Sequence, residues 1–275
     1  MIEDARGRID YDDAGGTGPT VVLVPGSCST GAAWRPVIAS WEGRFRCVTT
    51  SLLGYGGTAE RRTAQDPCIS HEAESLESVI REAGGSVHLV GHSFGGLVAL
   101  AVALRHRVPL ASLSIVEAPA AELLRDSNEE RHYRAFRQMT TSYFADFESG
   151  NSEAIASMID FYGGAGTYAS WPARVRAYAV ATTPVNILDW ASAYGFRLSG
   201  SDLAALRVPA LVIRGGASHP AVQRANELLA TCIRDASLVT IAGAAHFMIA
   251  THAVEVARAV ANLVQTEPAW RAATL

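Results

Sequence analysis

Lysine is absent from this chain, because all 23 basic residues among its 275 residues are arginines. A Schiff base or a pyridoxal-phosphate site needs a lysine amine, and so does the phosphate-binding loop of many nucleotide-binding proteins. The absence of lysine therefore excludes these three kinds of site. Any catalytic chemistry in this chain must use other side chains.

Long hydrophobic runs are also absent. The longest uninterrupted one, Leu97–Leu104, is far shorter than the ~20 residues that a membrane-spanning helix needs. The first residues include Glu3, Asp4 and Arg6 and contain no apolar segment typical of a secretory signal. Hydrophobic residues make up 49% of the chain and charged residues 18%, which is enough apolar material for a large core and excludes disorder. We therefore expect a folded cytoplasmic protein that has no membrane partner.

An excess of positive charge is missing as well. The formal net charge is −4 at neutral pH, so the chain lacks the basic character that most nucleic-acid-binding domains have. A small-molecule substrate is expected instead of nucleic acid. The sequence is compatible with either a monomer or a homodimer.

Metal-binding patterns are not found among the cysteines and histidines. The cysteines form no C-x-x-C pair and no zinc-finger spacing, and they are expected to be reduced thiols: Cys28, Cys47, Cys68 and Cys232. His88 and His92 are four residues apart, but they flank a predicted strand, where that spacing corresponds to about 13 Å. We expect neither a metal nor any other cofactor.

Short apolar runs that alternate with helical patterns indicate an α/β fold. Segments typical of strands are 8–12, 20–24, 45–50, 86–90, 110–116, 209–214 and 237–241. An apolar helix is predicted over 94–106, and helical spacing recurs among the apolar residues of 221–232 and 254–260. Strands joined by helices predict a mostly parallel central sheet with helices on both faces.

Residues 119–206 interrupt this alternation, because no strand is predicted there. The segment is rich in helix formers and in aromatic residues, which are Tyr133, Phe136, Tyr143, Phe144, Phe147, Phe161, Tyr162, Trp171, Tyr178, Trp190, Tyr194 and Phe196. The insertion lies between two predicted strands, at the carboxyl edge of the sheet where ligands bind in such folds. We therefore expect a core domain made of 1–118 and 207–275, and a helical lid made of 119–206. The aromatics can form the insertion's own core, line a pocket, or do both.

The strongest local motif is Gly91-x-Ser93-x-Gly95, between an apolar strand and an apolar helix. A sharp turn from strand to helix forces Ser93 into a strained conformation, and glycines on both sides avoid collisions with the neighbouring backbone. The turn exposes the Ser93 hydroxyl at a helix N-terminus, where the helix dipole favours developing negative charge. Ser93 is therefore a candidate nucleophile.

With this motif, the chain resembles the α/β-hydrolase superfamily over nearly its whole length. Val21–Ser27 looks like the family's strand that ends in an oxyanion turn, and Thr50–Thr58 looks like its glycine-rich loop. Val208–Gly215 is similar to a late strand of the family, and Ala242–Phe247 to its histidine loop. The chain order, with the nucleophile first and the histidine last, also agrees. The resemblance implies the α/β-hydrolase fold with a helical lid, and a serine nucleophile of the esterase-like branch.

The catalytic roles follow from the resemblance and from the chemistry of a serine nucleophile. A free hydroxyl is a poor nucleophile, so Ser93 needs a base within hydrogen-bond reach, and His246 is the candidate. The developing oxyanion needs two donors, for which the backbone N–H groups of Ser27 and Phe94 are the candidates. Cys28 follows Ser27 and either lines the pocket or packs inertly.

The acid of the triad departs from the commonest pattern of the family. Ser218 stands where an aspartate is usual after the late strand, and a hydroxyl cannot stabilise an imidazolium as a carboxylate does. Some branches carry the acid at the end of the preceding strand, and there this chain has Glu117. We therefore favour Glu117 as the acid, although a structural or substrate-contacting role for it, Asp235 as a reserve, and a dyad without any carboxylate stay open.

These residues together predict a cofactor-independent serine hydrolase that cleaves an ester, thioester or lactone of a small, partly apolar substrate. Haloalkane dehalogenases and epoxide hydrolases resemble the chain, but they need aspartate at position 93. Two alternatives stay open. A cofactor-free dioxygenase of the same fold would use His246 as a base, and a ligand-binding or receptor protein would keep a slow or silent triad.

Several other features are interpreted as structural. Gly54–Ala59 matches a dinucleotide-binding pattern in its letters, but no helix is predicted to open from it, so it is expected to be a loop. Asp202 is expected to cap a helix, and the arginines of 131–137 to lie on a solvated helix face. His92 is expected to pack beside the nucleophile and not to act as a second base. For His219, two positions stay open, one that faces the active site and one outside it.

Overall fold

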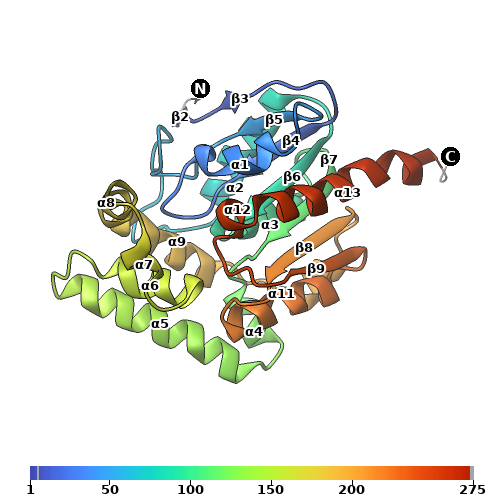
Figure 1. Ribbon diagram of the computed structural model, residues 1–275. Coiled ribbons are helices and arrows are strands. Elements are labelled where there is room, and N and C mark those ends of the chain that lie inside the picture. Colours follow the sequence, from blue (N-terminus) through green and yellow to red (C-terminus); the bar gives the residue numbers. More distant parts are fainter. Residues whose placement is uncertain (5, 273–275) are drawn as a thin grey trace.

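A seven-stranded sheet forms the centre of the computed structural model, which describes residues 1–4 and 6–272 (Figure 1). The strand order is β3-β5-β4-β6-β7-β8-β9, and all neighbours are parallel except β3, which pairs antiparallel with β5 at the edge. The strands of this sheet are β3 (Asp12–Asp13), β4 (Thr20–Val24), β5 (Arg46–Thr49), β6 (Val87–His92), β7 (Leu110–Val116), β8 (Ala210–Gly215) and β9 (Ala236–Ile241). A separate hairpin is formed by β1 (Ile2–Asp4) and β2 (Gly7–Ile9).

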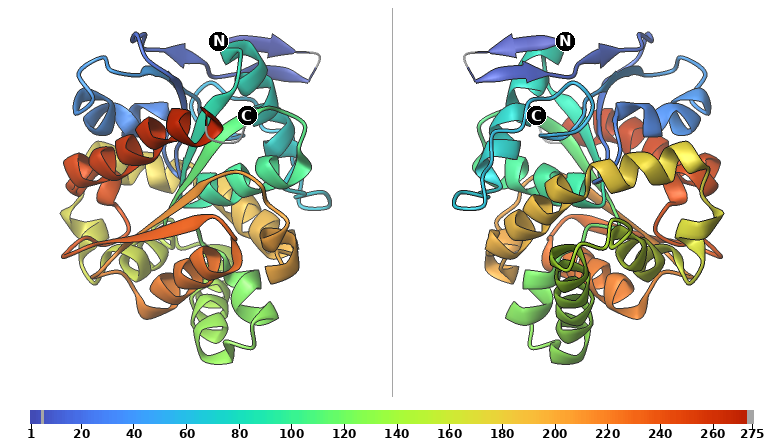
Figure 2. Two further views of the ribbon diagram at one scale, coloured as in Figure 1. Left: turned by 90° about the vertical axis from the view of Figure 1, so that its right-hand side faces the viewer. Right: turned by 90° about the vertical axis from the view of Figure 1, so that its left-hand side faces the viewer.

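Helices cover both faces of the sheet (Figures 1 and 2). One face carries α2 (Ser70–Ala83), α3 (Phe94–Arg105) and α11 (Pro220–Cys232). The other face carries the short helix η1 (Gly31–Trp34), α1 (Arg35–Ala39), α12 (Met248–Thr251) and α13 (Ala253–Ala272). The predicted α/β class, with a mostly parallel sheet covered on both faces, is confirmed.

The central strands are apolar on both sides, as expected for a sheet that is covered twice. In β4, the side chains of Val22 and Val24 pack into the core under α2 and α3, and those of Val21 and Leu23 pack into the core under α1 and α13. Successive residues of a strand point to opposite faces, so one short strand serves both cores. The continuous apolar run of β4, and not an alternating pattern, is the signature of this arrangement.

The segment between β7 and β8 contains only helices among its described residues. They are α4 (Ala121–Asp126), α5 (Glu130–Glu148), α6 (Ile155–Gly163), α7 (Thr167–Ser170), α8 (Ala173–Ala181), α9 (Thr183–Gly195) and α10 (Gly200–Ala204). Of these helices, α5 to α9 lie together at one end of the molecule (Figure 1), and α4, α5 and α10 contact α11 of the core. An ion pair between Glu129 and Arg224, with 2.6 Å between oxygen and nitrogen, joins the two parts.

Two local predictions differ from the structure. The strand predicted over 8–12 is divided between β2, which belongs to the hairpin, and β3, which joins the main sheet. The cap of α10 is Ser199 and not Asp202, because the Ser199 hydroxyl accepts a hydrogen bond from the Asp202 N–H at 3.2 Å. Asp202 lies in the first turn of that helix, where a carboxylate is favoured by the helix dipole.

Within the described part of the chain, none of the helices combines the length and the apolar character that are needed to span a bilayer. The loop interpretation of Gly54–Ala59 agrees with the structure, since residues 50–69 form neither helix nor strand.

The two-sided burial of the sheet predicts unequal effects for one substitution in two strands. Leu89 in β6 is 0% exposed and Leu238 in β9 is 39% exposed. Replacing Leu89 by Ala should lower the free energy of unfolding by about 2–5 kcal/mol, because a cavity remains in the core. The matched Leu238→Ala change should stay within about 0.5 kcal/mol of the wild type. Urea denaturation of both variants measures the difference, and equal losses would contradict the assignment of the core.

Candidate active site

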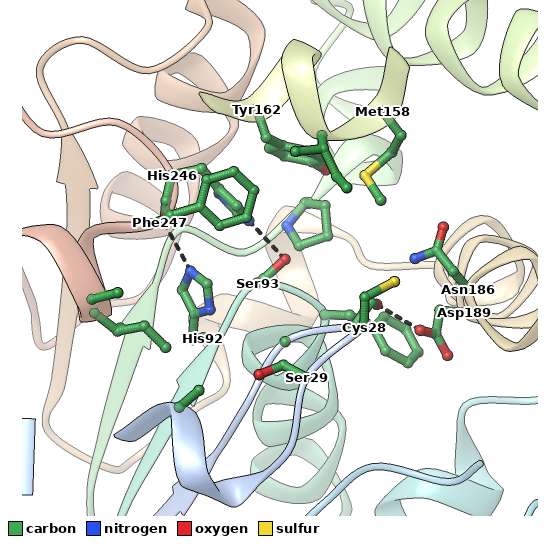
Figure 3. Close-up of a pocket in the computed structure, with 18 of the residues that line it drawn as sticks. Cys28, Ser29, His92, Ser93, Met158, Tyr162, Asn186, Asp189, His246 and Phe247 are labelled. Atoms are coloured by element: carbon green, nitrogen blue, oxygen red, sulfur yellow. Dashed lines mark hydrogen bonds between the residues drawn. The ribbon is translucent and has the colours of Figure 1, made fainter. Parts of the chain in front are cut away.

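The carboxyl ends of β6, β7 and β8 lie side by side and bring distant residues to one edge of the sheet. Ser93 follows β6 directly, and its backbone N–H donates to the carbonyl of Val116 at 2.8 Å. The φ angle of Ser93 is +54°, in the left-handed region that non-glycine residues rarely adopt. This turn starts α3 and directs the Ser93 hydroxyl into a cavity (Figure 3).

Glycines make this turn sterically possible. A Cβ atom on Gly91 would lie 2.3 Å from the carbonyl oxygen of Gly95, and one on Gly95 would lie 2.2 Å from that of Pro25. A Cβ atom on Gly26 would lie 2.8 Å from the Cβ of Ser93. A larger residue at any of these glycine positions would therefore prevent the close approach of the loop after β4 to Ser93.

Ser93, His246 and Glu117 form one chain of hydrogen bonds. The Nε2 atom of His246 lies 2.9 Å from Ser93 Oγ, and its Nδ1 atom lies 2.9 Å from Glu117 Oε2. A carboxylate only accepts, so His246 Nδ1 carries the proton and the Nε2 lone pair faces the serine hydroxyl. The three residues that the sequence predicted to be catalytic thus meet, although Ser93 and His246 are 153 positions apart.

The carboxylate of Glu117 is 0% exposed and accepts hydrogen bonds from several donors. Besides His246, the backbone N–H of Gly215 donates to it at 2.6 Å, and the hydroxyl of Ser218 donates to the same oxygen. Ser218, at the position where the family usually has its acid, therefore serves as a donor to the glutamate. Asp235 is exposed to solvent and is not part of this chain of hydrogen bonds.

His92 lies against His246, with ring centroids 4.8 Å apart. Its Nε2–H donates to the backbone carbonyl of His246 at 2.9 Å. Burial is the main cause that lowers the pKa of His92 to about 3, and the proximity of His246 adds to it. His92 is therefore a neutral, packed neighbour that fixes the position of the His246 backbone.

Ser27 lies in the loop after β4, and Phe94 is the first residue of α3, directly after Ser93. Both residues line the cavity. Neither amide donates a hydrogen bond within residues 1–4 and 6–272. Two unused donors beside the serine are what an oxyanion requires.

A buried ionic cluster behind Ser27 was not foreseen from the sequence. The Ser27 hydroxyl donates to Asp189, which also accepts from Tyr55 at 2.6 Å and pairs with Arg62 at 2.8 Å. The Arg62 side chain is 0% exposed and also pairs with Glu72 at 3.3 Å. Burial is the main cause that raises the pKa of Glu72 to about 8, and the nearby Arg62 guanidinium opposes this rise. No local signal marks this cluster, because its residues come from three distant segments.

A cavity of about 350 Å³ opens over Ser93 (Figure 3). Most of its wall is apolar and comes from residues of the segment 119–206, from Phe247 and from α12: Met158, Ile159, Trp171, Pro172, Val175, Trp190, Ala193, Phe247, Ile249 and Ala250. Cys28 also lines it, and burial raises the pKa of this thiol to about 12, so it is an un-ionised and weakly reactive group.

The aromatics of the insertion divide between the two roles that the sequence left open. Tyr162, Trp171 and Trp190 line the cavity, whereas Phe136 and Tyr143 are fully buried and are not part of its wall. The Tyr162 ring packs on the imidazole of His246, with centroids 4.1 Å apart.

His219 does not face the cavity. Its ring stacks on Phe161 with centroids 4.2 Å apart, and its Nδ1 accepts from the N–H of Ala221 at the start of α11. Among the described residues, no cluster of histidine, cysteine and acidic side chains has an arrangement that could hold a metal ion. His88 and His92 have separate partners, since His88 bonds to Ser112 at 2.8 Å.

Comparison with known proteins identifies the family. A model of the alpha/beta hydrolase family matches residues 21–259. The chain belongs to this family. Haloalkane dehalogenase 2 of Mycobacterium bovis is 33% identical to it over 104 residues, which are 38% of this chain and 36% of that protein. Pimeloyl-acyl-carrier-protein methyl ester esterase of Vibrio atlanticus is 35% identical over 97 residues, 35% of each chain.

These alignments span only about a third of the length of the curated relatives. Solved structures match over far more of the α/β hydrolase fold. The enol-lactonase of Burkholderia xenovorans has a TM-score of 0.72 at 19% identity, covering 94% of this chain and 96% of its own. The esterase of Exiguobacterium antarcticum has a TM-score of 0.75 at 16% identity, covering 96% and 98%. At such identities the likeness shows the fold alone.

The lowered pKa of His92 predicts a specific pH dependence of stability. Its pKa is about 3 when folded, against an ordinary value of 6.5, so only the unfolded chain binds a proton there between these two values. The contribution of His92 to the free energy of unfolding is therefore fully present above pH 6.5, and it is lost progressively as the pH falls towards 3. In His92→Gln, whose amide can still donate to the His246 carbonyl, this loss should disappear.

The free energy of unfolding of the wild type minus that of His92→Gln should therefore decrease by about 2 kcal/mol between pH 7 and pH 5. Urea denaturation at these two pH values measures this difference. The contributions of the other histidines to the pH dependence cancel, because both proteins contain them. A difference that is the same at both pH values would show that His92 is not held neutral.

Proposed function

We propose that this chain is a cofactor-independent serine hydrolase that cleaves an ester, thioester or lactone through an acyl-enzyme on Ser93. The observation that carries the proposal is the continuous hydrogen-bond chain from Ser93 through His246 to Glu117, with 2.9 Å at both steps, at the floor of a cavity. A hydroxyl, a neutral imidazole acceptor and a buried carboxylate in this order are the elements that nucleophilic acyl transfer requires.

In the proposed first step, Ser93 Oγ attacks the substrate carbonyl carbon while His246 Nε2 takes the hydroxyl proton. The carbonyl oxygen becomes an oxyanion, which the N–H groups of Ser27 and Phe94 stabilise. The carbon–oxygen or carbon–sulfur bond then breaks, and the leaving alkoxide or thiolate receives the proton from His246.

In the proposed second step, His246 takes a proton from a water molecule whose oxygen attacks the acyl carbon. The bond between that carbon and Ser93 Oγ then breaks, His246 returns the proton to Oγ, and the carboxylic acid leaves. Glu117 keeps the imidazole in the reactive tautomer and stabilises the imidazolium that forms in both steps. Tyr162 and His92 pack on the two sides of the imidazole, which limits its rotation.

The substrate is proposed to be small and partly apolar. A cavity of about 350 Å³ with a largely apolar wall supports this size and character. We further propose residues 119–206 as a lid, because their helices supply much of that wall. An esterase among the relatives and an enol-lactonase among the similar folds support ester and lactone chemistry. Serine at position 93 argues against the aspartate-dependent reactions of the dehalogenase relatives.

Removal of the nucleophile tests the mechanism. Ser93→Ala should abolish hydrolysis of p-nitrophenyl esters and of enol-lactones, while circular dichroism and the melting temperature stay close to those of the wild type. The matched control Ser237→Ala changes an exposed hydroxyl in β9 and should keep full activity. Undiminished turnover by Ser93→Ala would overturn the proposal.

The same variant separates the two alternatives. Oxygen uptake that needs His246 but survives Ser93→Ala would instead indicate a cofactor-free dioxygenase. Stoichiometric labelling of wild-type Ser93 by a fluorophosphonate, with negligible turnover of a broad ester panel, would indicate a receptor.

A second substitution tests Glu117. Glu117→Gln should lower kcat by roughly 10³- to 10⁴-fold, because a neutral amide neither selects the reactive imidazole tautomer nor stabilises the imidazolium. Ser218→Ala removes only one of three donors to the carboxylate, and it should cost roughly tenfold or less. Steady-state kinetics of both variants on one ester measures the contrast. If Glu117→Gln had the wild-type kcat, Glu117 would not be the acid of the triad.

A further inference from the structure

The loop after β4, residues 25–29, carries one of the two candidate oxyanion donors, the Ser27 N–H. Among the described residues, the N–H and C=O groups of this loop form no backbone–backbone hydrogen bond with another segment. Cys28 has a φ angle of +55°, a strained conformation that persists only where surrounding contacts hold it. The position of the Ser27 N–H therefore depends on the side-chain contacts and the packing of the loop.

Asp189 in helix α9 of the insertion provides such a contact. Its Oδ2 atom accepts hydrogen bonds from the hydroxyls of Ser27 at 2.5 Å and of Tyr55 at 2.6 Å. Its Oδ1 atom pairs with the Arg62 guanidinium at 2.8 Å. Because both oxygens have partners and the side chain is buried, the carboxylate is held in one orientation. It can therefore fix the direction of the Ser27 side chain.

The negative charge of Asp189 needs compensation if Ser27 is to bind an oxyanion. A carboxylate close to a developing oxyanion would destabilise it, unless a cation offsets the charge. The Arg62 side chain, which is 0% exposed, supplies that cation. The same guanidinium lies 5.9 Å from the centre of the ring of Phe94, the residue with the other candidate donor. One ion pair therefore contacts both residues that carry the candidate oxyanion donors.

We propose that Asp189 is a positioning residue, which holds Ser27 so that its N–H faces the oxyanion formed at Ser93, while Arg62 offsets the charge of the carboxylate. Asp189 contacts no reacting atom in this scheme and acts through the Ser27 hydroxyl. The insertion then contributes to the rate of the reaction as well as to the wall of the cavity. This inference rests on the proposed function and adds to it a residue that positions the oxyanion donor.

The first test removes the contact and keeps the donor. Ser27→Ala lacks the hydroxyl that binds Asp189 but retains the backbone N–H. Its kcat on a p-nitrophenyl ester should fall roughly tenfold or more, because a misplaced donor stabilises the oxyanion less well. Its KM should change by less than about twofold, since the ground state carries no oxyanion. Steady-state kinetics measures both constants.

A matched control is available on the other side of the same ionic cluster. The buried hydroxyl of Ser192 accepts from Arg62 at 3.4 Å and donates to the carbonyl of Pro67. Ser192→Ala therefore removes a buried hydroxyl of the cluster that has no contact with Ser27. It should keep the wild-type kcat, whatever it does to the melting temperature.

The second test measures the coupling between the two residues. Asp189→Ala should lower kcat at least as much as Ser27→Ala does. The double variant should have about the kcat of Asp189→Ala alone, because both changes break the same connection. If Asp189→Ala does not fold, the comparison of Ser27→Ala with Ser192→Ala decides the inference.

An inhibitor provides a measurement that is independent of turnover. A trifluoromethyl ketone that is attacked by Ser93 Oγ at its carbonyl carbon gives a tetrahedral adduct with an oxyanion. Its inhibition or dissociation constant should rise in Ser27→Ala by about the factor by which kcat/KM falls, and it should stay unchanged in Ser192→Ala. A purely structural role of the contact would not weaken the adduct relative to the substrate complex.

Four outcomes would overturn the inference. They are a kcat of Ser27→Ala equal to that of Ser192→Ala, a loss confined to KM, independent effects that multiply in the double variant, and equal affinity of the ketone for Ser27→Ala and the wild type. Each leaves the proposed function intact when turnover by the wild type still depends on Ser93. A wild type that neither hydrolyses esters or lactones nor forms the ketone adduct would defeat the proposed function, and this inference with it.

Discussion

The carboxylate of Glu117 is the point on which the arrangement of the active site depends. It is fully buried directly after β7, with a φ angle of +48°, and it accepts hydrogen bonds from three groups on two segments. The donors are the backbone of Gly215 at the end of β8, the hydroxyl of Ser218 in the loop that follows, and the imidazole of His246 after β9. A buried charge is tolerated only with such partners, so the groups that stabilise the carboxylate also fix the histidine loop relative to the serine turn.

A second polar system stabilises the opposite side of Ser93. Asp189 in α9 accepts from Ser27 and pairs with the buried guanidinium of Arg62, which links the insertion to the loop after β4. The loop that offers one of the two candidate oxyanion donors, the Ser27 N–H, is therefore held to the insertion, and His246 is held to the core. Among the described residues, three of the six non-glycine residues with positive φ angles belong to the site, and they are Cys28, Ser93 and Glu117. These contacts pre-organise the site before substrate arrives.

The sequence predicted those parts of the molecule that depend on neighbouring residues. The apolar strands and the glycines around Ser93 are local patterns, and they correctly indicated the sheet and the turn. Ser218 in place of the usual acid was visible in the sequence, but its role as a donor to Glu117 depends on the distance between two strand ends. The ionic cluster of Arg62 and Asp189, and the choice of which aromatics line the cavity, depend on how helices of the insertion pack, which periodicity alone does not determine.

The most direct test of the account is to trap the acyl-enzyme. A slowly deacylating substrate such as p-nitrophenyl trimethylacetate is mixed with the wild-type protein, the reaction is quenched in acid, and the peptides are analysed by mass spectrometry. The account predicts a burst of p-nitrophenol stoichiometric with enzyme, and one trimethylacetyl group on the peptide that contains Ser93. An acyl group on any other residue, or turnover without a modified peptide or a burst, would contradict it.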